Sequence, residues 1–109
     1  MPYITEKQRD YITPALLEVL RLIKALGHVQ AWEGRKTPPS EPEKLAAAAG
    51  ILNYAITSLA VGLTEKPSYA RCALIRGVLH DADSEYYRRL VAPYEDKKAA
   101  ENGDVYPTV

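Results

Sequence analysis

The feature that most restricts the fold of this chain is residues 45–64, a run of twenty residues without a charged side chain. Such a run is long enough to cross a bilayer as a helix. However, much of it is alanine, which adds little to membrane insertion, and it contains two glycines and the polar side chains of Asn53, Tyr54, Thr57 and Ser58. A helix buried inside a bundle explains the same pattern, and we expect that arrangement rather than a membrane span.

This segment also carries the signals of a helix. Ser40-x-x-Glu43 forms a capping box, and Pro42 falls in the first turn that it opens. One face then carries Leu45, Ala49, Leu52, Ile56, Leu59 and Leu63. The adjoining face is mostly small, with Ala46, Gly50, Asn53 and Thr57, and would let another helix approach closely. We therefore expect this helix to be the most buried of the fold, with contacts on more than one side.

A second helix is expected before it. Thr13-Pro14 is typical of an N-cap followed by proline at the first helical position, and Gly27 is placed to end the helix. The apolar positions between them recur at helical spacing: Leu16, Val19, Leu20, Ile23 and Leu26. A shorter turn could begin at Thr5, because Thr5-x-x-Gln8 fits a capping box.

A third helix is expected after Lys66-Pro67-Ser68, which caps it. Its apolar face holds Leu74, Ile75, Val78, Leu79, Ala82, Tyr86 and Leu90. Pro93 should stop or kink it, and a short last helix would cover residues 93–101 before the stop signal Asn102-Gly103. The predicted fold is thus all-α, a small bundle of three long helices plus a short C-terminal helix after Pro93.

We expect a single helical domain over residues 1–109, since this length suits one modest core. The connection at about residues 28–40 contains Gly34 and the pair Pro38-Pro39, and we expect it to be the most exposed and mobile stretch, with room for a ligand-facing loop. Residues 104–109 should form an irregular tail, because their apolar side chains follow no period.

Composition narrows the function classes. Fourteen basic and fourteen acidic side chains cancel, so the chain lacks the broad positive charge of a non-specific nucleic-acid binder, although a local basic patch remains open. The lone Cys72 cannot form an internal disulfide, and residues 1–7 contain no apolar core of a signal peptide. These observations favour a cytoplasmic protein.

The sharpest enzymatic hypothesis rests on His80-Asp81, because adjacent His and Asp on a helix can both reach divalent metals in one class of phosphohydrolases. Such a site needs further ligands, and His28 is the only other histidine. A solvated helix face explains both residues more simply, so we expect no metal, no cofactor and no catalysis. Cys72 beside His28 or His80 could suggest a thiol nucleophile, but among Ala70, Ala73 and Leu74 a small buried cysteine is the expected reading.

The most informative cluster lies near the C-terminal end. Arg89 falls inside the apolar arc of the third helix, one turn after Glu85, where an arginine must form an ion pair, extend along its stem or meet a partner. Beside a structural Glu85–Arg89 pair, we keep a second interpretation, a binding site for an anion or for carboxylates of another chain. Its candidate residues are Tyr87, Arg88, Arg89, Tyr94, Lys97 and Lys98.

Asn53, Tyr54 and Thr57 are the other binding candidates. Asn53 and Thr57 stand one turn apart on a largely apolar helix. Neighbouring helices could satisfy these side chains, or the three residues could line a small polar pocket.

The segment Glu85-Tyr86-Tyr87-Arg88-Arg89-x-x-x-Pro93-Tyr94-Glu95-Asp96-x-Lys98, followed by Glu101-Asn102-Gly103-Asp104-Val105-Tyr106, resembles the ending of a family of small phage- and prophage-encoded proteins of unknown function. Leu52-Asn53-Tyr54-Ala55-Ile56-Thr57 and Met1-Pro2-Tyr3-Ile4 are also similar to stretches of that family. His80-Asp81 departs from the family pattern, which weakens the metal-enzyme hypothesis further. The resemblance implies a phage source inside a bacterial host cell, and it implies no mechanism.

The functional prediction is therefore a non-catalytic phage or prophage accessory protein that binds a host protein or sequesters a small anionic ligand, such as a nucleotide signal of host defence. The alternative is a metal-dependent phosphohydrolase that acts on nucleotides through His80 and Asp81. Self-association is also expected, because the apolar stripes are broad for so short a chain and small helical domains often complete their cores by forming oligomers.

Overall fold

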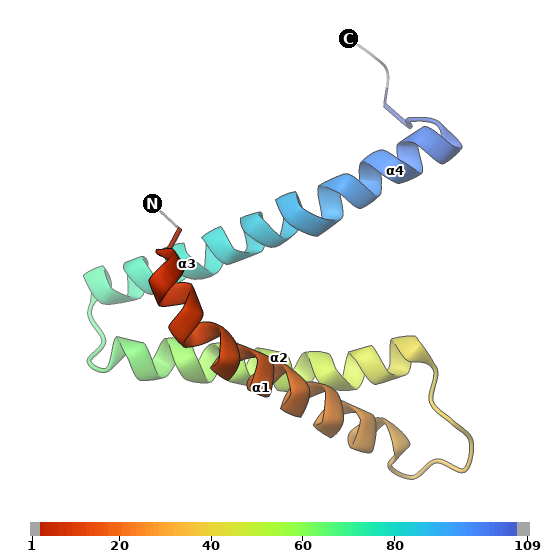
Figure 1. Cartoon of the computed structure of the whole chain (residues 1–109), viewed down its shortest axis with the longest axis horizontal. Coiled ribbons are helices and arrows are strands. Elements are labelled where there is room, and N and C mark those ends of the chain that lie inside the picture. Colours follow the sequence, from red (N-terminus) through yellow and green to blue (C-terminus); the bar gives the residue numbers. More distant parts are fainter. Residues whose placement is uncertain (1–2, 107–109) are drawn as a thin grey trace. The chain divides into compact units, whose positions relative to one another are not determined.

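The computed structural model describes residues 3–106 of the chain, and Figure 1 shows its course. These residues are 82% helical and contain no strand, which confirms the all-α class. Two helices, α1 (Glu6–Trp32) and α2 (Glu41–Thr64), come first. They are followed by α3 (Tyr69–Tyr86), the π-helical turn η1 (Tyr87–Val91) and α4 (Ala92–Asn102), which succeed one another without a break.

The chain divides into two compact units, Met1–Glu65 and Lys66–Val109. The first unit holds α1 and α2, and the second holds α3, η1 and α4. The single domain over residues 1–109 stays a prediction.

Helix α1 is longer at both ends than the sequence signals predict. The capping box at Thr5 opens it: the Thr5 hydroxyl accepts a bond from the Gln8 N–H at 3.2 Å, and the Gln8 side chain accepts one from the Thr5 N–H at 2.9 Å. Pro14 therefore lies inside the helix and not at its first position, so the predicted start at Thr13-Pro14 is wrong. Pro14 stands roughly 140° around the helix from Gly27, so its ring does not obstruct the side on which Gly27 lies.

The predicted helix end at Gly27 is also wrong, because α1 continues to Trp32. Gly27 is helical, and Gly34 adopts the left-handed conformation instead, with φ +68°. Beside it the Arg35 N–H donates to the Trp32 carbonyl at 3.1 Å. The chain therefore turns at Gly34, just after the helix, whereas Gly27 serves for packing.

The connection between the two helices covers residues 33–40, shorter than predicted because α1 extends further. Arg35 organises it, with its guanidinium donating to the carbonyls of Thr37 at 3.2 Å and Pro38 at 3.4 Å and forming an ion pair with Glu43. Pro39 is buried, so the connection is not exposed throughout. The side chain of Arg35 is therefore used to order the chain itself.

The first unit is a helical hairpin in which α1 and α2 run in opposite directions and contact each other (Figure 1). The capping box at Ser40 opens α2 as predicted, with the Ser40 hydroxyl accepting from the Glu43 N–H at 3.2 Å. The helices come closest where Gly27 faces Ala48, so close that a Cβ added at Gly27 would lie 2.8 Å from the Ala48 Cβ. Small residues do allow the approach, but they are Gly27 and Ala48, and not the predicted small positions such as Ala46 and Gly50.

The residues of α2 that are half-buried beside this contact include Ala47, Ala48, Ile51 and Ala55. The predicted core stripe from Leu45 to Leu63 lies on a different face, and α2 has no buried residue, so the prediction of a most-buried central helix is wrong. The physical reason is that α1 is the one other helix of this unit and covers a single side of α2. By length and composition α2 also qualifies as a membrane-spanning helix, with none of its apolar window buried.

The second unit is one helical run of 34 residues. The Ser68 hydroxyl caps it by accepting from the Arg71 N–H at 3.1 Å, as predicted. Of the two outcomes predicted at Pro93, a stop or a kink, the stop does not occur: the Ala92 N–H reaches back five residues to the Tyr87 carbonyl, and the helix goes on. A π turn widens the backbone just before the proline ring, which relieves the clash that Pro93 would make with the carbonyl four residues earlier.

The run ends at Asn102, one residue beyond the predicted end at Glu101 and within the predicted stop Asn102-Gly103. Gly103 has φ +84°, and its N–H donates to the Ala99 carbonyl at 2.9 Å. Residues 104–106 are irregular, in agreement with the expected tail, whereas residues 107–109 of that tail lie outside the described range.

Candidate functional site

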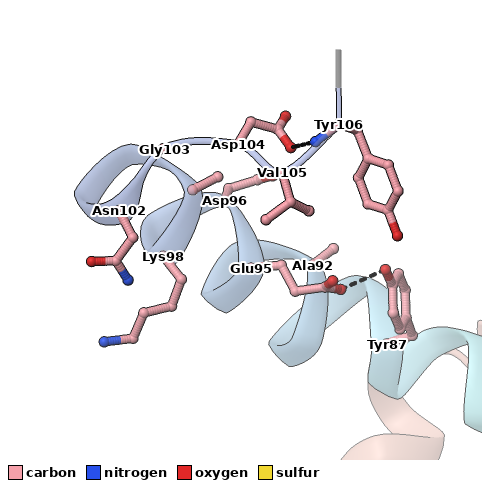
Figure 2. A pocket seen from close by; sticks show the side chains of 11 residues that line it. Tyr87, Ala92, Glu95, Asp96, Lys98, Asn102, Gly103, Asp104, Val105 and Tyr106 are labelled. Atoms are coloured by element: carbon pink, nitrogen blue, oxygen red, sulfur yellow. Dashed lines mark hydrogen bonds between the residues drawn. The ribbon is translucent and has the colours of Figure 1, made fainter. Parts of the chain in front are cut away.

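A pocket of about 450 Å³ lies in the second unit, where the chain turns back after α4. It is lined by Tyr87, Ala92, Glu95, Asp96, Lys98, Ala99, Asn102, Gly103, Asp104, Val105 and Tyr106. The left-handed backbone of Gly103 reverses the chain, and the Tyr106 N–H donates to the Asp104 carboxylate at 3.0 Å. This turn brings the Tyr106 ring to the side of α4 on which the Tyr87 ring lies (Figure 2).

One hydrogen bond joins the start of the pocket's helical wall to its middle. The Tyr87 hydroxyl donates to the Glu95 carboxylate at 2.6 Å, across eight residues (Figure 2). Eight residues of α-helix rise about 12 Å, and the π turn between them shortens that path. The bond to Glu95 raises the pKa of Tyr87 above its usual value, because a phenolate would lie beside a carboxylate, and Asp96 adds to the effect.

The electrostatics of this pocket favour cations. Its lining includes the three carboxylates of Glu95, Asp96 and Asp104 and the one ammonium of Lys98. Lys98 is held by Glu101 at 3.3 Å and lies 5.6 Å from the centre of the Tyr94 ring, and its amino group points away from Tyr87 and Tyr106 (Figure 2). The pocket as built would accept a positively charged or neutral group more readily than an anion.

The two candidate arginines lie on the helical wall but do not line the pocket. The Arg88 guanidinium donates to both carboxylate oxygens of Glu85, at 2.8 and 3.1 Å, and Arg89 lies 3.4 Å from the same carboxylate. The predicted Glu85–Arg89 ion pair is thus present, and Arg88 shares it.

The predicted cluster is only partly assembled. Tyr87 and Lys98 line the pocket, and Tyr94 contacts Lys98 from beside it. Lys97 is exposed on α4 and does not contribute to the lining. The structure therefore separates the tyrosines from the arginines that sequence reasoning placed in one site.

Asn53, Tyr54 and Thr57 lie in the first unit, on α2. The Thr57 hydroxyl donates to the Asn53 side-chain oxygen at 3.1 Å, so the two residues bond to each other within one helix. Tyr54 is exposed, and none of the three lines the pocket. Whether these three residues bind a ligand stays a prediction.

The residues proposed for metal or thiol chemistry are exposed on α3. His80 and Asp81 face solvent, and residues 3–106 contain no group of three or more His, Cys, Asp or Glu side chains placed to hold a metal ion. Cys72 is exposed, so its predicted burial is wrong. The reason is that its unit consists of a single helical run, with no second helix of that unit to cover it.

Sequence reasoning missed most of the pocket, namely Glu95, Asp96, Asn102, Asp104, Val105 and Tyr106. The sequence predicts the helix stop at Asn102-Gly103, but the prediction did not include the return of the following residues over α4. A glycine that follows a helix with positive φ reverses the chain, and the apolar Val105 and Tyr106 lie within three positions of Gly103. That signal could have placed the tail against α4.

No curated protein and no solved structure gives a significant match to this chain. A family model does match residues 1–105, which is nearly the whole chain. That family is described as a domain of unknown function, so it supplies a relationship without an activity. The match spans every helix of both units and the tail as far as Val105, and the chain therefore belongs to the family of the domain of unknown function DUF6899.

Proposed function

We propose that this chain is a non-catalytic phage or prophage accessory protein that binds a host polypeptide through its second unit. The source rests on the resemblance of the segment from Glu85 to Tyr106 to small phage-encoded proteins. The proposed place of action is the interior of the bacterial host cell.

The observation that carries the polypeptide partner is the apolar stripe of α3. Ile75, Val78, Leu79, Ala82 and Tyr86 recur at helical spacing along one side of the helix. Among the described residues of the second unit there is no second helix to cover this stripe, because α3, η1 and α4 form a single helical run. A narrow apolar stripe on a helix suits docking against another helix or into an apolar groove.

The charges near the C-terminal end support a polypeptide over a small anion. Arg88 and Arg89 already pair with Glu85, and the pocket beyond them carries more carboxylates than ammonium groups. A basic side chain of a bound polypeptide would complement this pocket, with the rings of Tyr87 and Tyr106 beside it. A nucleotide would instead meet Glu95, Asp96 and Asp104 there.

Affinity capture from a lysate of the bacterial host, with three baits, tests the proposal. The baits are the wild-type chain, Leu79→Asp on the stripe, and His80→Asp on the neighbouring exposed face of α3. We expect at least one host protein that the wild type and His80→Asp retain and Leu79→Asp loses. With that protein purified, Leu79→Asp should weaken binding by 2 kcal/mol or more, roughly 30-fold or greater, as for a central apolar contact.

A thermal-shift screen with nucleotides and cyclic nucleotides tests the anionic ligand. A ligand at about 100 times its Kd stabilises a protein by roughly 2.7 kcal/mol. A shift that disappears in Arg88→Gln and Arg89→Gln, together with baits that retain identical proteins, would replace the polypeptide partner with an anion.

A further inference from the structure

Helix α2 has two apolar faces, and the hairpin uses one of them. Ala47, Ala48, Ile51 and Ala55 are half-buried toward α1. The second face, which we name the α2 seam, consists of Leu45, Ala49, Leu52, Ile56, Leu59 and Leu63. Its large side chains remain between 43% exposed, at Ile56, and 74% exposed, at Leu63.

The spacing of the α2 seam indicates the kind of surface that covers it. Its six residues are separated by four, three, four, three and four positions, which is the a/d pattern of a coiled coil. Leucine occupies each d position, at 45, 52 and 59, and Ala49, Ile56 and Leu63 occupy the a positions. A repeat of this kind keeps one line of side chains facing a second helix, with each residue inserted between four residues of that helix.

The flanks of the seam identify which helix it fits. The e and g positions are Ala46, Ala48, Asn53, Ala55, Ala60 and Gly62, all uncharged and mostly small. Two identical helices can therefore approach closely without like charges facing each other. A seam that meets its own copy about a two-fold axis needs no complementary partner, which is the usual way in which small soluble proteins assemble.

The seam is long enough for such an assembly. Its six residues span positions 45–63, which is about 27 Å of helix. The large side chains of Leu45, Leu59 and Leu63 lie at its ends and are the most exposed, and Leu52 and Ile56 continue the exposed line between them. An apolar line of nearly three heptads is the length over which two helices can pack along a common seam.

We propose that the α2 seam pairs with the same seam of a second copy of this chain, so that two α1–α2 hairpins form a four-helix core around two copies of α2. This pairing gives both apolar faces of α2 a role. The face of mostly small residues contacts α1, and the leucine-rich seam contacts the partner copy. This pairing involves the first unit, and it does not depend on the partner proposed for the second unit.

Analytical ultracentrifugation of the full chain tests the pairing with a matched pair of variants. Ile56→Asp places a charge at the centre of the seam, and Val61→Asp places the same charge on the opposite side of α2, where Val61 is 67% exposed. We expect the wild type and Val61→Asp to sediment at twice the mass of 12.1 kDa. Ile56→Asp should sediment as a monomer, with its dimer Kd raised at least 100-fold.

A cross-linking experiment keeps the proposal testable if Ile56→Asp fails to fold. In a Cys72→Ser background, which removes the exposed native thiol, single cysteines are placed at Ile56 or at Val61 and treated with a short bifunctional maleimide. Covalent dimers should form at position 56 and not at position 61. A wild-type monomer at hundreds of micromolar would overturn the pairing, as would equal cross-linking at both positions. Partition of the wild type into phosphatidylethanolamine–phosphatidylglycerol vesicles would assign the seam to lipid instead.

Discussion

Gly27 and Ala48 show at the scale of single residues how this chain packs. The absence of a side chain at Gly27 sets the distance between α1 and α2, because an added Cβ would lie 2.8, 2.9 and 3.0 Å from the Cβ, Cα and N atoms of Ala48. Two of these atoms belong to the backbone, so one whole helix would have to move. The glycine therefore matters for contact and not for chain reversal.

We predict that Gly27→Ala destabilises the chain although alanine favours helices. The gain in helix propensity is about 1 kcal/mol, and overpacking against a backbone costs about 1–3 kcal/mol, so a net loss of roughly 1 kcal/mol is expected. Gly50→Ala on α2 is the control, because a Cβ there meets nothing within 4 Å. It should stabilise the chain by about 0.5–1 kcal/mol. Urea unfolding followed by circular dichroism measures both, and a gain at Gly27 would contradict the close helix contact.

Tyr87 provides a second prediction at the residue scale. Its pKa is raised, mainly by the hydrogen bond to Glu95, so the stabilising bond is present below the usual tyrosine pKa of about 10 and is lost as pH rises through the raised pKa. Glu95→Gln should return the pKa of Tyr87 toward its ordinary value, and Asp96→Asn should lower it much less. NMR titration of the assigned Tyr87 ring resonances measures both, and equal effects would argue against the Tyr87–Glu95 bond.

At the scale of elements, the helices of this chain are begun by short-range bonds. Thr5 and Ser40 open α1 and α2 with complete capping boxes, and Ser68 opens α3 with a hydroxyl bond to the Arg71 N–H. The start of α2 is the most elaborate, because Arg35 from the preceding connection also reaches Glu43. Glu43 thus links the helix start to the connection that leads into it.

We predict that the contribution of Glu43 depends on pH. Its pKa is lowered, first by the hydrogen bond from the Ser40 backbone N–H, then by the Ser40 side chain, with a smaller contribution from Arg35. A carboxyl with a lowered folded-state pKa stabilises the fold above its unfolded pKa of about 4.3, and this contribution is lost as pH falls through the folded value.

Glu43→Gln should therefore melt below the wild type at pH 7, and the difference should shrink as the pH falls through the folded-state pKa of Glu43 and the wild-type carboxyl becomes protonated. Glu41→Gln is the control for removing a negative charge from the same helical turn, and its effect should be smaller. Thermal unfolding across this pH range measures the three chains. A difference that stays constant with pH would show that ionisation of Glu43 plays no part.

At the scale of the whole molecule, residues 3–106 contain no buried aliphatic or aromatic side chain apart from the Pro39 ring, and large apolar side chains are exposed on α1, α2 and α3. The first unit has two helices and the second has one helical run. Neither arrangement has enough helices to enclose a core. In proteins, helices gain most of their stability from packing of an apolar face and not from intrinsic propensity. The stability of this chain must therefore depend on contacts beyond those made inside each unit.

The proposed pairing of α2 predicts that thermal stability rises with protein concentration, because a dimer binds its second copy in the folded state alone. For a dimer of this size we expect Tm to rise by about 3 °C for each tenfold increase in concentration. The Tm of Ile56→Asp should be lower and independent of concentration, while Val61→Asp should behave as the wild type does. Calorimetry over a hundredfold range measures this, and a constant wild-type Tm would contradict the dimer.

The sequence alone determined the features that depend on residues three or four positions apart. The all-α class, the capping boxes at Thr5 and Ser40, the cap at Ser68, the stop at Gly103 and the Glu85–Arg89 pair were all predictable. The caps, the stop and the ion pair each join residues three or four positions apart, within about one helical turn. The residues that they join are therefore neighbours in the sequence, and the pattern of residue types is sufficient.

Tertiary structure decided the features in which one face of a helix competes with another. Both faces of α2 are apolar, and only the fit of Gly27 against Ala48 selects the small face for α1 and leaves the leucine seam open. One predicted outcome at Pro93 was a stop, but a single π turn accommodates the ring, a backbone adjustment that no residue pattern announces. The pocket formed because the tail after Gly103 turns back over α4. Close approach and chain reversal depend on shape in three dimensions, and periodicity in one dimension does not contain that information.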